Sequence, residues 1–67
     1  MNIACSDETV VANVRAVFLK YEVPQVRQQG PNFGYPMIWV MANVAMSDDK
    51  ERAIRREIAR IAGATIH

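Results

Sequence analysis

Apolar and polar residues alternate in several segments of the chain, and apolar residues with helical spacing mark two segments between them. In residues 1–5, Ile3 and Cys5 fall on one face, and Asn2 and Ala4 fall on the other. This period of two predicts a short strand at the start of the chain.

The first helical segment covers residues 9–22, where apolar residues recur every three or four positions, as in a helix with one buried face. Ser6 is the predicted N-cap, and the two acidic residues after it suit the positive end of the helix dipole. Pro24 ends the helix, because the residue before a proline resists helical geometry. The apolar stripe consists of Val10, Val11, Val14, Val17, Phe18 and Tyr21.

Two strands and a turn are predicted in the middle of the chain. Residues 23–29 have the pattern of an edge strand, because Pro24 and the charge of Arg27 suit the edge of a sheet. Residues 30–36, GPNFGYP, form the turn, and residues 37–46 form a strongly alternating strand. One face of that strand carries Ile38, Val40, Ala42 and Val44, and the other carries Met37, Trp39, Met41, Asn43 and Ala45.

The second helical segment begins in residues 47–51, where Asp48 and Glu51 have the spacing of a capping box. Gly63 stands where a glycine commonly ends a helix, and residues 64–67 are long enough for one short closing strand. The apolar seam of this helix consists of Ile54, Ile58 and Ile61.

The resulting order is strand, helix, strand, strand, helix, strand, which is the ferredoxin-like βαββαβ arrangement of the α+β class. We expect a single domain over residues 1–67, with an antiparallel four-stranded sheet in the order 4-1-3-2. Both helices should cover one face of the sheet, which leaves the other face open. The residues expected on the open face are Asn2, Ala4, Arg27, Trp39, Met41, Asn43, Thr65 and His67.

Composition narrows the class of protein. Eight basic and seven acidic residues give a net charge of +1, well short of the basicity typical of proteins that rely on phosphate contacts. The one cysteine excludes an internal disulfide and suits a reducing compartment. The first residues lack the pattern of a signal peptide, and no apolar run reaches the length of a membrane helix. We therefore expect a soluble cytoplasmic protein of bacterial or viral style.

Catalytic and metal-binding patterns are weak in this sequence. The antiparallel topology puts Cys5 and His67 about 13 Å apart, at 3.3 Å per strand residue, which is too far to share a metal ion. Cys5 is expected to be a small buried apolar residue, and His67 a frayed terminal residue. The acidic pairs at 7–8 and 48–49 suit helix starts, and no glycine-rich phosphate loop is present. We expect neither an enzyme nor a cofactor.

Trp39 lies between Met37 and Met41 on the predicted open face, and an uncovered apolar patch of this kind marks an interface. Tryptophan, methionine and arginine are enriched in protein interfaces. The residues proposed for this interface are Trp39, Met37, Met41, Arg27, Phe33 and Tyr35. The alternative is stacking of nucleic-acid bases on Trp39, although the strand at the start of the chain offers no second aromatic.

Arg52, Arg56 and Arg60 are spaced four residues apart, so they form one stripe on the second helix, with Lys50 nearby. This stripe suits an acidic protein surface or phosphates. The simpler interpretation is a solvated helix face, neutralised in part by the pairs Glu51–Arg55 and Glu57–Arg60.

In general layout the chain is similar to small ferredoxin-like regulatory modules, including ACT-type domains. In its short length, its lack of a catalytic motif and its exposed aromatic patch, it resembles small phage inhibitors such as anti-CRISPR proteins. We therefore expect a non-enzymatic module that binds a second copy of itself or a larger protein complex. The alternative is a small nucleic-acid-binding module that uses Trp39 and the arginines of the second helix.

Overall fold

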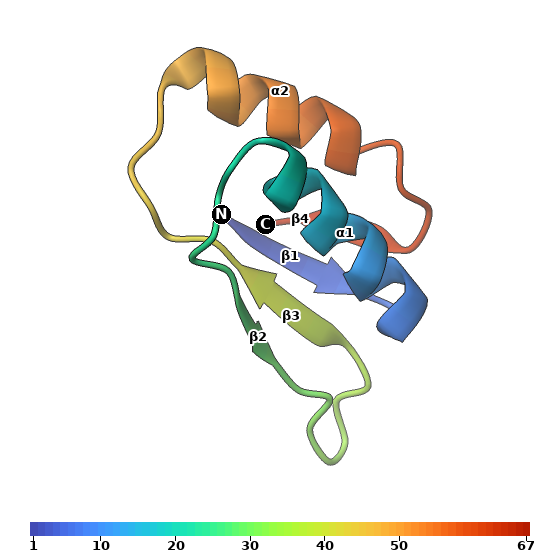
Figure 1. Ribbon diagram of the computed structural model, residues 1–67. Helices are drawn as coiled ribbons and strands as arrows, with labels where there is room; N and C mark the ends of the chain where they lie inside the picture. The colour runs from blue at the N-terminus through green and yellow to red at the C-terminus, as the bar shows by residue number, and fades with distance from the viewer.

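The computed structural model describes residues 1–67 and has the predicted order of elements (Figure 1). The strands form one antiparallel sheet in the order β2-β3-β1-β4, which confirms the predicted ferredoxin-like topology. The elements are β1 (Asn2–Cys5), α1 (Glu8–Lys20), β2 (Arg27–Gln29), β3 (Ile38–Met41), α2 (Asp48–Ile58) and β4 (Ala64–Ile66).

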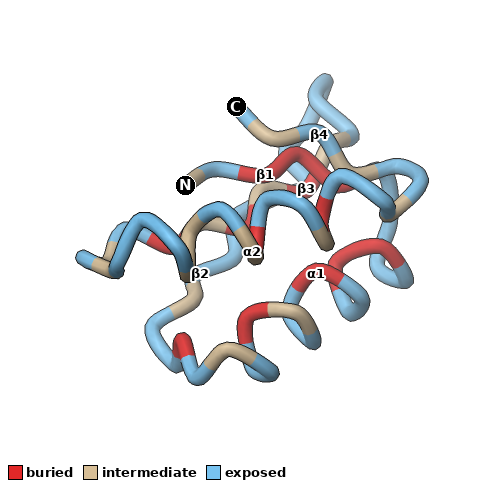
Figure 2. The backbone as a smooth tube through the Cα atoms, turned by 90° about the horizontal axis from the view of Figure 1, so that it is seen from above, coloured by how far each residue is buried: buried red, intermediate tan, exposed pale blue.

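Both helices pack on one face of the sheet, and the core lies between the two layers (Figure 2). The two central strands supply Ile3 opposite Val40 and Cys5 opposite Ile38, and all four side chains are buried. The helices contribute Val10, Val11, Val14, Phe18, Ile54 and Ile58. No polar or charged residue is buried, so burial of apolar surface holds the two layers together.

The first helix differs from prediction at both ends. Its N-cap is Asp7 rather than Ser6, because the Asp7 carboxylate accepts a hydrogen bond from the Val10 N–H at 3.0 Å. The helix ends at Lys20, and Glu22 then adopts a positive φ of 59°. The Val23 N–H donates to the Phe18 carbonyl at 2.9 Å, which completes a Schellman motif. Sequence gave no sign of this motif because its left-handed residue is a glutamate rather than a glycine.

The second helix is shifted by one residue at its start and is shorter than predicted. Ser47 rather than Asp48 is the N-cap, and its hydroxyl accepts a hydrogen bond from the Lys50 N–H. The helix ends at Ile58, and tighter turns follow, in which the Ile61 N–H donates to the Ile58 carbonyl. Gly63 therefore lies in the connection to β4 rather than at the end of the helix.

The strands around the central turn are also shorter than predicted. β3 covers residues 38–41 instead of 37–46, and β2 covers residues 27–29 instead of 23–29. The Ala42 N–H donates to the Met1 carbonyl, and the Ala42 carbonyl accepts from the amino group of Met1. The paired strand begins at Met1, so residues 43–46 have no strand beside them. Residues 30–37 form a loop that projects from the body of the molecule (Figure 1).

Candidate functional site

The sheet face opposite the helices is uncovered, and the pairing of the strands arranges its residues in rows. Arg27 on β2 is opposite Met41 on β3, which is opposite Asn2 on β1. In the next row Gln29 is opposite Trp39, and Ala4 lies between Trp39 and Thr65.

The strand register is therefore the predicted one, with Ile38 and Val40 on the helix side and Trp39 on the open side.

Trp39 is the centre of this face, and it contacts His67 across β1. The centroids of the two rings lie 5.0 Å apart with an interplanar angle of 62°. Adjacent strands are about 4.8 Å apart, so β3 and β4 are separated by roughly twice that distance and both rings must lean over β1. Ala4 is opposite Trp39 and therefore on the open face, as predicted, but it is only 3% exposed.

His67 is held in place, so the expectation of a frayed terminal residue is wrong. Its backbone N–H donates to the Asn2 carbonyl at 2.8 Å, which extends the pairing of β4 with β1 by one residue. Together with the ring contact to Trp39, this bond makes His67 part of the open face. The only sequence signal was the alternation of Thr65, Ile66 and His67, which is too short to distinguish pairing from fraying.

The two methionines of the proposed interface lie where the sequence placed them. Met41 is the last residue of β3, and Met37 immediately precedes the strand, so the two methionines flank Trp39. All three side chains are partly exposed. Arg27 is exposed at the edge of the same face, beside Met41. The open face therefore has an apolar centre with a polar rim of Arg27, Gln29, Asn2, Thr65 and His67.

The two aromatics of the central turn lie apart from this centre. Asn32 and Tyr35 pair through two backbone hydrogen bonds, so Phe33 and Gly34 form the tip of the projecting loop. The Phe33 side chain is fully exposed and Tyr35 is half exposed. The only aromatic pair in the molecule is Trp39 with His67, so neither Phe33 nor Tyr35 stacks on Trp39.

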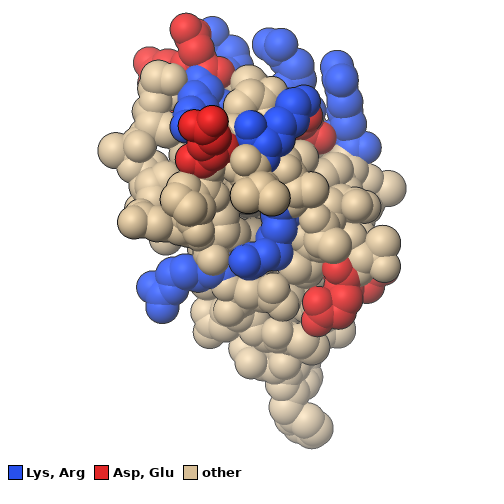
Figure 3. Space-filling model, in the orientation of Figure 1, with Lys and Arg blue, Asp and Glu red and all other residues tan.

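The arginines of α2 lie on the other side of the sheet from Trp39, because α2 belongs to the helix layer. Figure 3 shows basic side chains along α2 on the helix side of the molecule. Arg52 is 3.8 Å from Asp49, whereas Arg56 and Arg60 form no ion pair, and Lys50 is partly buried. A ligand that contacts Trp39 and this stripe together must therefore pass around the edge of the sheet.

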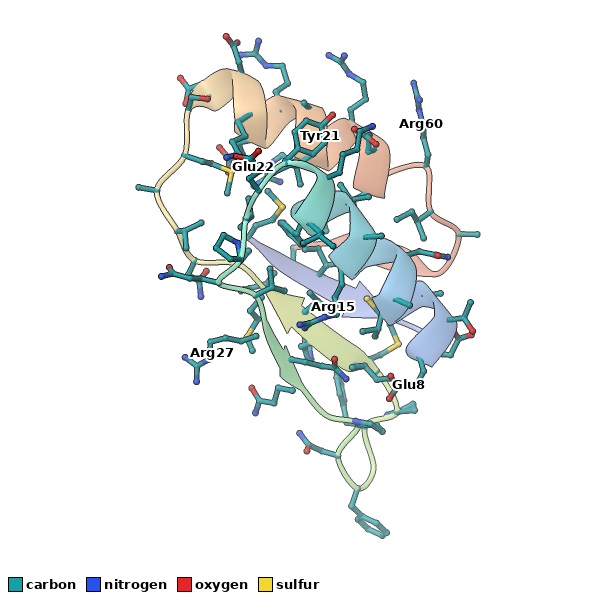
Figure 4. The ribbon with its side chains drawn as sticks, viewed as in Figure 1. Glu8, Arg15, Tyr21, Glu22, Arg27 and Arg60 are labelled. Atoms are coloured by element: carbon teal, nitrogen blue, oxygen red, sulfur yellow. The ribbon has the colours of Figure 1, made fainter.

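Only one of the two neutralising ion pairs expected on α2 is present. Arg55 lies 3.4 Å from Glu51, as expected. Glu57 does not pair with Arg60 but accepts hydrogen bonds from Lys20, at 3.0 Å, and from the Tyr21 hydroxyl. These contacts join the end of α1 to α2, so Glu57 has a structural role. Figure 4 shows Tyr21 beside α2.

The contacts of Glu57 shift three pKa values. Hydrogen bonds from Tyr21 and then Lys20 lower the pKa of Glu57 below its ordinary value of 4.5. The hydrogen bond to Glu57 raises the pKa of Tyr21 above 10.0 and that of Lys20 above 10.5. The lowered carboxyl pKa stabilises the fold above pH 4.5 and ceases to do so as the pH falls through the lowered value. The raised values stabilise it below pH 10 and cease to do so in alkali.

We expect Tyr21→Phe to reduce the loss of stability in acid that Glu57 causes. The substitution removes the largest cause of the lowered Glu57 pKa and keeps the bond from Lys20. The acid loss of stability should therefore be smaller than in the wild type, and it should be complete at a higher pH. Urea unfolding between pH 2 and pH 7 measures this loss, and Glu57→Gln should flatten it. Identical acid profiles for the wild type and Glu57→Gln would contradict the assignment.

Cys5 is fully buried within the core, as expected of a small apolar residue. Burial, followed by the charge of Asp7, raises the pKa of its thiol and so disfavours the thiolate that a nucleophile needs. The structure contains no group of three or more His, Cys, Asp or Glu side chains placed to hold a metal ion.

A groove beside α1 is the feature that sequence reasoning missed. It has a volume of about 450 Å³ and lies against the outer side of α1 and the connection to β2. Ala12, Ala16 and Leu19 recur at positions i, i+4 and i+7, so this helix has a second, exposed apolar stripe. The groove is lined by Ala12, Arg15, Ala16, Leu19, Val23, Pro24 and Val26.

No protein-family model, curated protein or solved structure matches this chain. Neither helix of the structure has the length and apolar character needed to cross a bilayer.

Proposed function

We propose that this protein is a non-enzymatic interaction module that binds another protein through the open sheet face around Trp39. The observation that supports this most directly is the position of Trp39. It lies on a central strand, between two partly exposed methionines, on the face that neither helix covers. A large aromatic in the middle of an uncovered apolar patch with a polar rim has the anatomy of an interface hot spot.

The partner is a second copy of this chain or a larger protein complex whose working surface the module would block. A two-fold dimer would place the same patch on both partners and cover both tryptophans at once. The open face carries one arginine and no carboxylate, so its centre favours apolar contact. The stripe on α2 would then form a separate, electrostatic contact on the other side of the molecule.

Trp39→Glu is expected to keep the fold and to weaken association by at least about thirtyfold, as loss of a hot-spot tryptophan does. The matched control replaces Arg52, Arg56 and Arg60 by glutamate, which changes the other side of the molecule. Sedimentation equilibrium of the wild type and both variants, at low and moderate salt, measures self-association directly.

A dimer that is insensitive to salt, and that becomes a folded monomer only in Trp39→Glu, supports self-association through the open face. If the wild type is a monomer, affinity capture with the same three proteins provides the test. A protein retained by the wild type and the arginine variant, but not by Trp39→Glu, supports a larger partner. Capture of nucleic acid that weakens steeply with salt would favour base stacking instead, and no difference between the wild type and Trp39→Glu would refute the proposal.

A further inference from the structure

The groove beside α1 adjoins the free edge of the sheet, and the two features together suit one kind of ligand. Val26, the last residue that lines the groove, immediately precedes Arg27, the first residue of β2. β2 is the outer strand of the sheet and pairs only with β3. The backbone of residues 27–29 makes no other hydrogen bond, so its outward N–H and carbonyl groups are available to a partner.

The charges near this edge are positive and unpaired. Arg15 lines the groove on α1, and Arg27 begins β2, yet neither forms an ion pair. Arg15 on α1 is exposed, and Figure 4 shows Arg27 pointing outward from β2. The groove has no acidic residue in its lining; Glu22, at the end of α1, is the acidic residue next to it in sequence.

We propose that the β2 edge and the adjoining groove bind an extended peptide segment that alternates apolar and acidic residues. The segment adds a fifth strand to the sheet beside β2. Alternate side chains of an added strand point to opposite faces. The apolar ones enter the groove against Leu19 and Val26, and the acidic ones lie beside Arg27 on the other face.

The backbone, the apolar side chains and the carboxylates of this peptide each match a separate feature of the protein. The strand supplies partners for the unpaired backbone of β2, the apolar side chains cover Leu19, which is 75% exposed, and the carboxylates pair with Arg27. A second copy of this chain is disfavoured, because it would bring a second Arg15 and Arg27 to this edge, and the groove lining contains no acidic residue to pair with them. The other edge strand, β4, has no such groove, since the groove beside α1 is the only one in the molecule.

The probe is a capped nine-residue peptide that alternates valine and glutamate and carries a fluorescent label, and the readout is fluorescence anisotropy. We expect it to bind the wild type, and the same peptide with lysine in place of glutamate to bind at least roughly tenfold more weakly. Arg27→Glu and Leu19→Ser should each weaken binding of the glutamate peptide by about fivefold or more. Trp39→Glu and Arg52→Glu, which alter the two other surfaces, should bind it as the wild type does.

Methylation of the peptide amides tests strand addition itself. Only alternate N–H groups of an added strand point at the receiving edge. One peptide methylated at the valines and another at the glutamates should therefore behave differently, with one losing binding and the other keeping it. Equal binding of both methylated peptides, or equal binding of the lysine peptide, would overturn the proposal.

Two further outcomes identify another occupant or another site. A wild-type dimer that occludes the amides of residues 27–29 from hydrogen exchange would make a second copy the occupant and overturn the acidic peptide. Loss of peptide binding in Trp39→Glu but not in Arg27→Glu would move the site to the open face. That result would support binding through the open face around Trp39 and would overturn peptide binding at the β2 edge. The two proposals can therefore fail independently.

Discussion

Val40→Glu is expected to unfold the protein, whereas Trp39→Glu, at the next position on the same strand, leaves it folded. Val40 is fully buried between the sheet and the helices, opposite Ile3 on β1. A glutamate at this position would bury a carboxylate among apolar side chains, because the core contains no polar or charged group to receive it.

The magnitudes decide the outcome. A chain of 67 residues has a total stability of roughly 3 to 10 kcal/mol at 0.05–0.15 kcal/mol per residue. An unpaired buried charge, together with the lost apolar contacts of Val40, costs about 5 kcal/mol or more. Trp39 is partly exposed and faces solvent, so a glutamate there stays hydrated and loses mainly the contacts with Ala4 and His67.

Far-UV circular dichroism and the dispersion of amide resonances in NMR distinguish the two variants. Gln28→Glu is a further control, because Gln28 is opposite Val40 on β2 but is exposed. It should remain folded like Trp39→Glu. A folded Val40→Glu alongside an unfolded Trp39→Glu would mean that the two sheet faces are exchanged and that the open face described here is the core.

The alternation of buried and exposed residues that distinguishes Val40 from Trp39 is also the reason that the fold could be predicted from the sequence. Alternation over residues 37–46 fixes which side chains of the central strand share a face, and the helical stripes fix what covers that face. Right-handed crossovers then leave few sheet orders for two helices and four strands. The position of Trp39 on the uncovered side follows from Ile38 and Val40 alone.

The errors at the two helix starts arise because two residues that can act as an N-cap are adjacent in each case. Ser6 and Asp7 both suit an N-cap, as do Ser47 and Asp48, and the sequence does not say which one takes the extended conformation. The end of α1 depends on Glu22 in a left-handed conformation that propensity assigns to glycine. Packing of Val23 into the core holds Glu22 in this left-handed conformation.

The groove and the contact of His67 with Trp39 depend on distances between segments far apart in the chain. Ala12, Ala16 and Leu19 share one exposed face of α1, and they line a groove only because Val23 and Val26 return alongside α1. In the same way, Ala4 leaves room above β1 for two rings that belong to different strands. The sequence shows that Ala4 is small, but it does not show that the rings of Trp39 and His67 meet above β1.

Gly63→Ala is the second substitution with a large expected effect, and its cause is a close approach between two connections. Gly63 has a φ of +90°, and a Cβ atom there would lie 2.5 Å from the Ser6 hydroxyl oxygen and 2.9 Å from a methyl group of Val10. The Ser6 N–H also donates to the Gly63 carbonyl at 3.0 Å, so the two segments cannot separate without losing this bond.

The expected loss is about 2 to 5 kcal/mol in the free energy of unfolding. Roughly 1 to 2 kcal/mol comes from a side chain at positive φ, and about 1 to 3 kcal/mol comes from the displaced neighbours. Against a total stability of roughly 3 to 10 kcal/mol, this loss removes a large share of the stability of the protein. Urea unfolding followed by circular dichroism measures it.

Gly34→Ala is the matched control, because it separates the two causes. Gly34 has a similar φ of +79°, but nothing lies within 4 Å of the position that a Cβ would take. In this variant the free energy of unfolding should fall only by the cost of a side chain at positive φ. The difference between the two alanine variants therefore measures the cost of the close approach at Gly63. Equal losses at both positions would show that the connection before β4 moves aside freely.

A second comparison identifies the neighbour responsible. Ser6→Ala removes the hydroxyl oxygen at 2.5 Å and keeps the Ser6 Cβ, which would lie 3.5 Å from the new methyl group. Because the two substitutions act on the same contact, their effects should not add, and Gly63→Ala should cost less in the Ser6→Ala background. The Val10 methyl group at 2.9 Å remains in that background, so the rescue should be partial. Full additivity would instead place the whole cost in the backbone of Gly63 and in its contact with Val10.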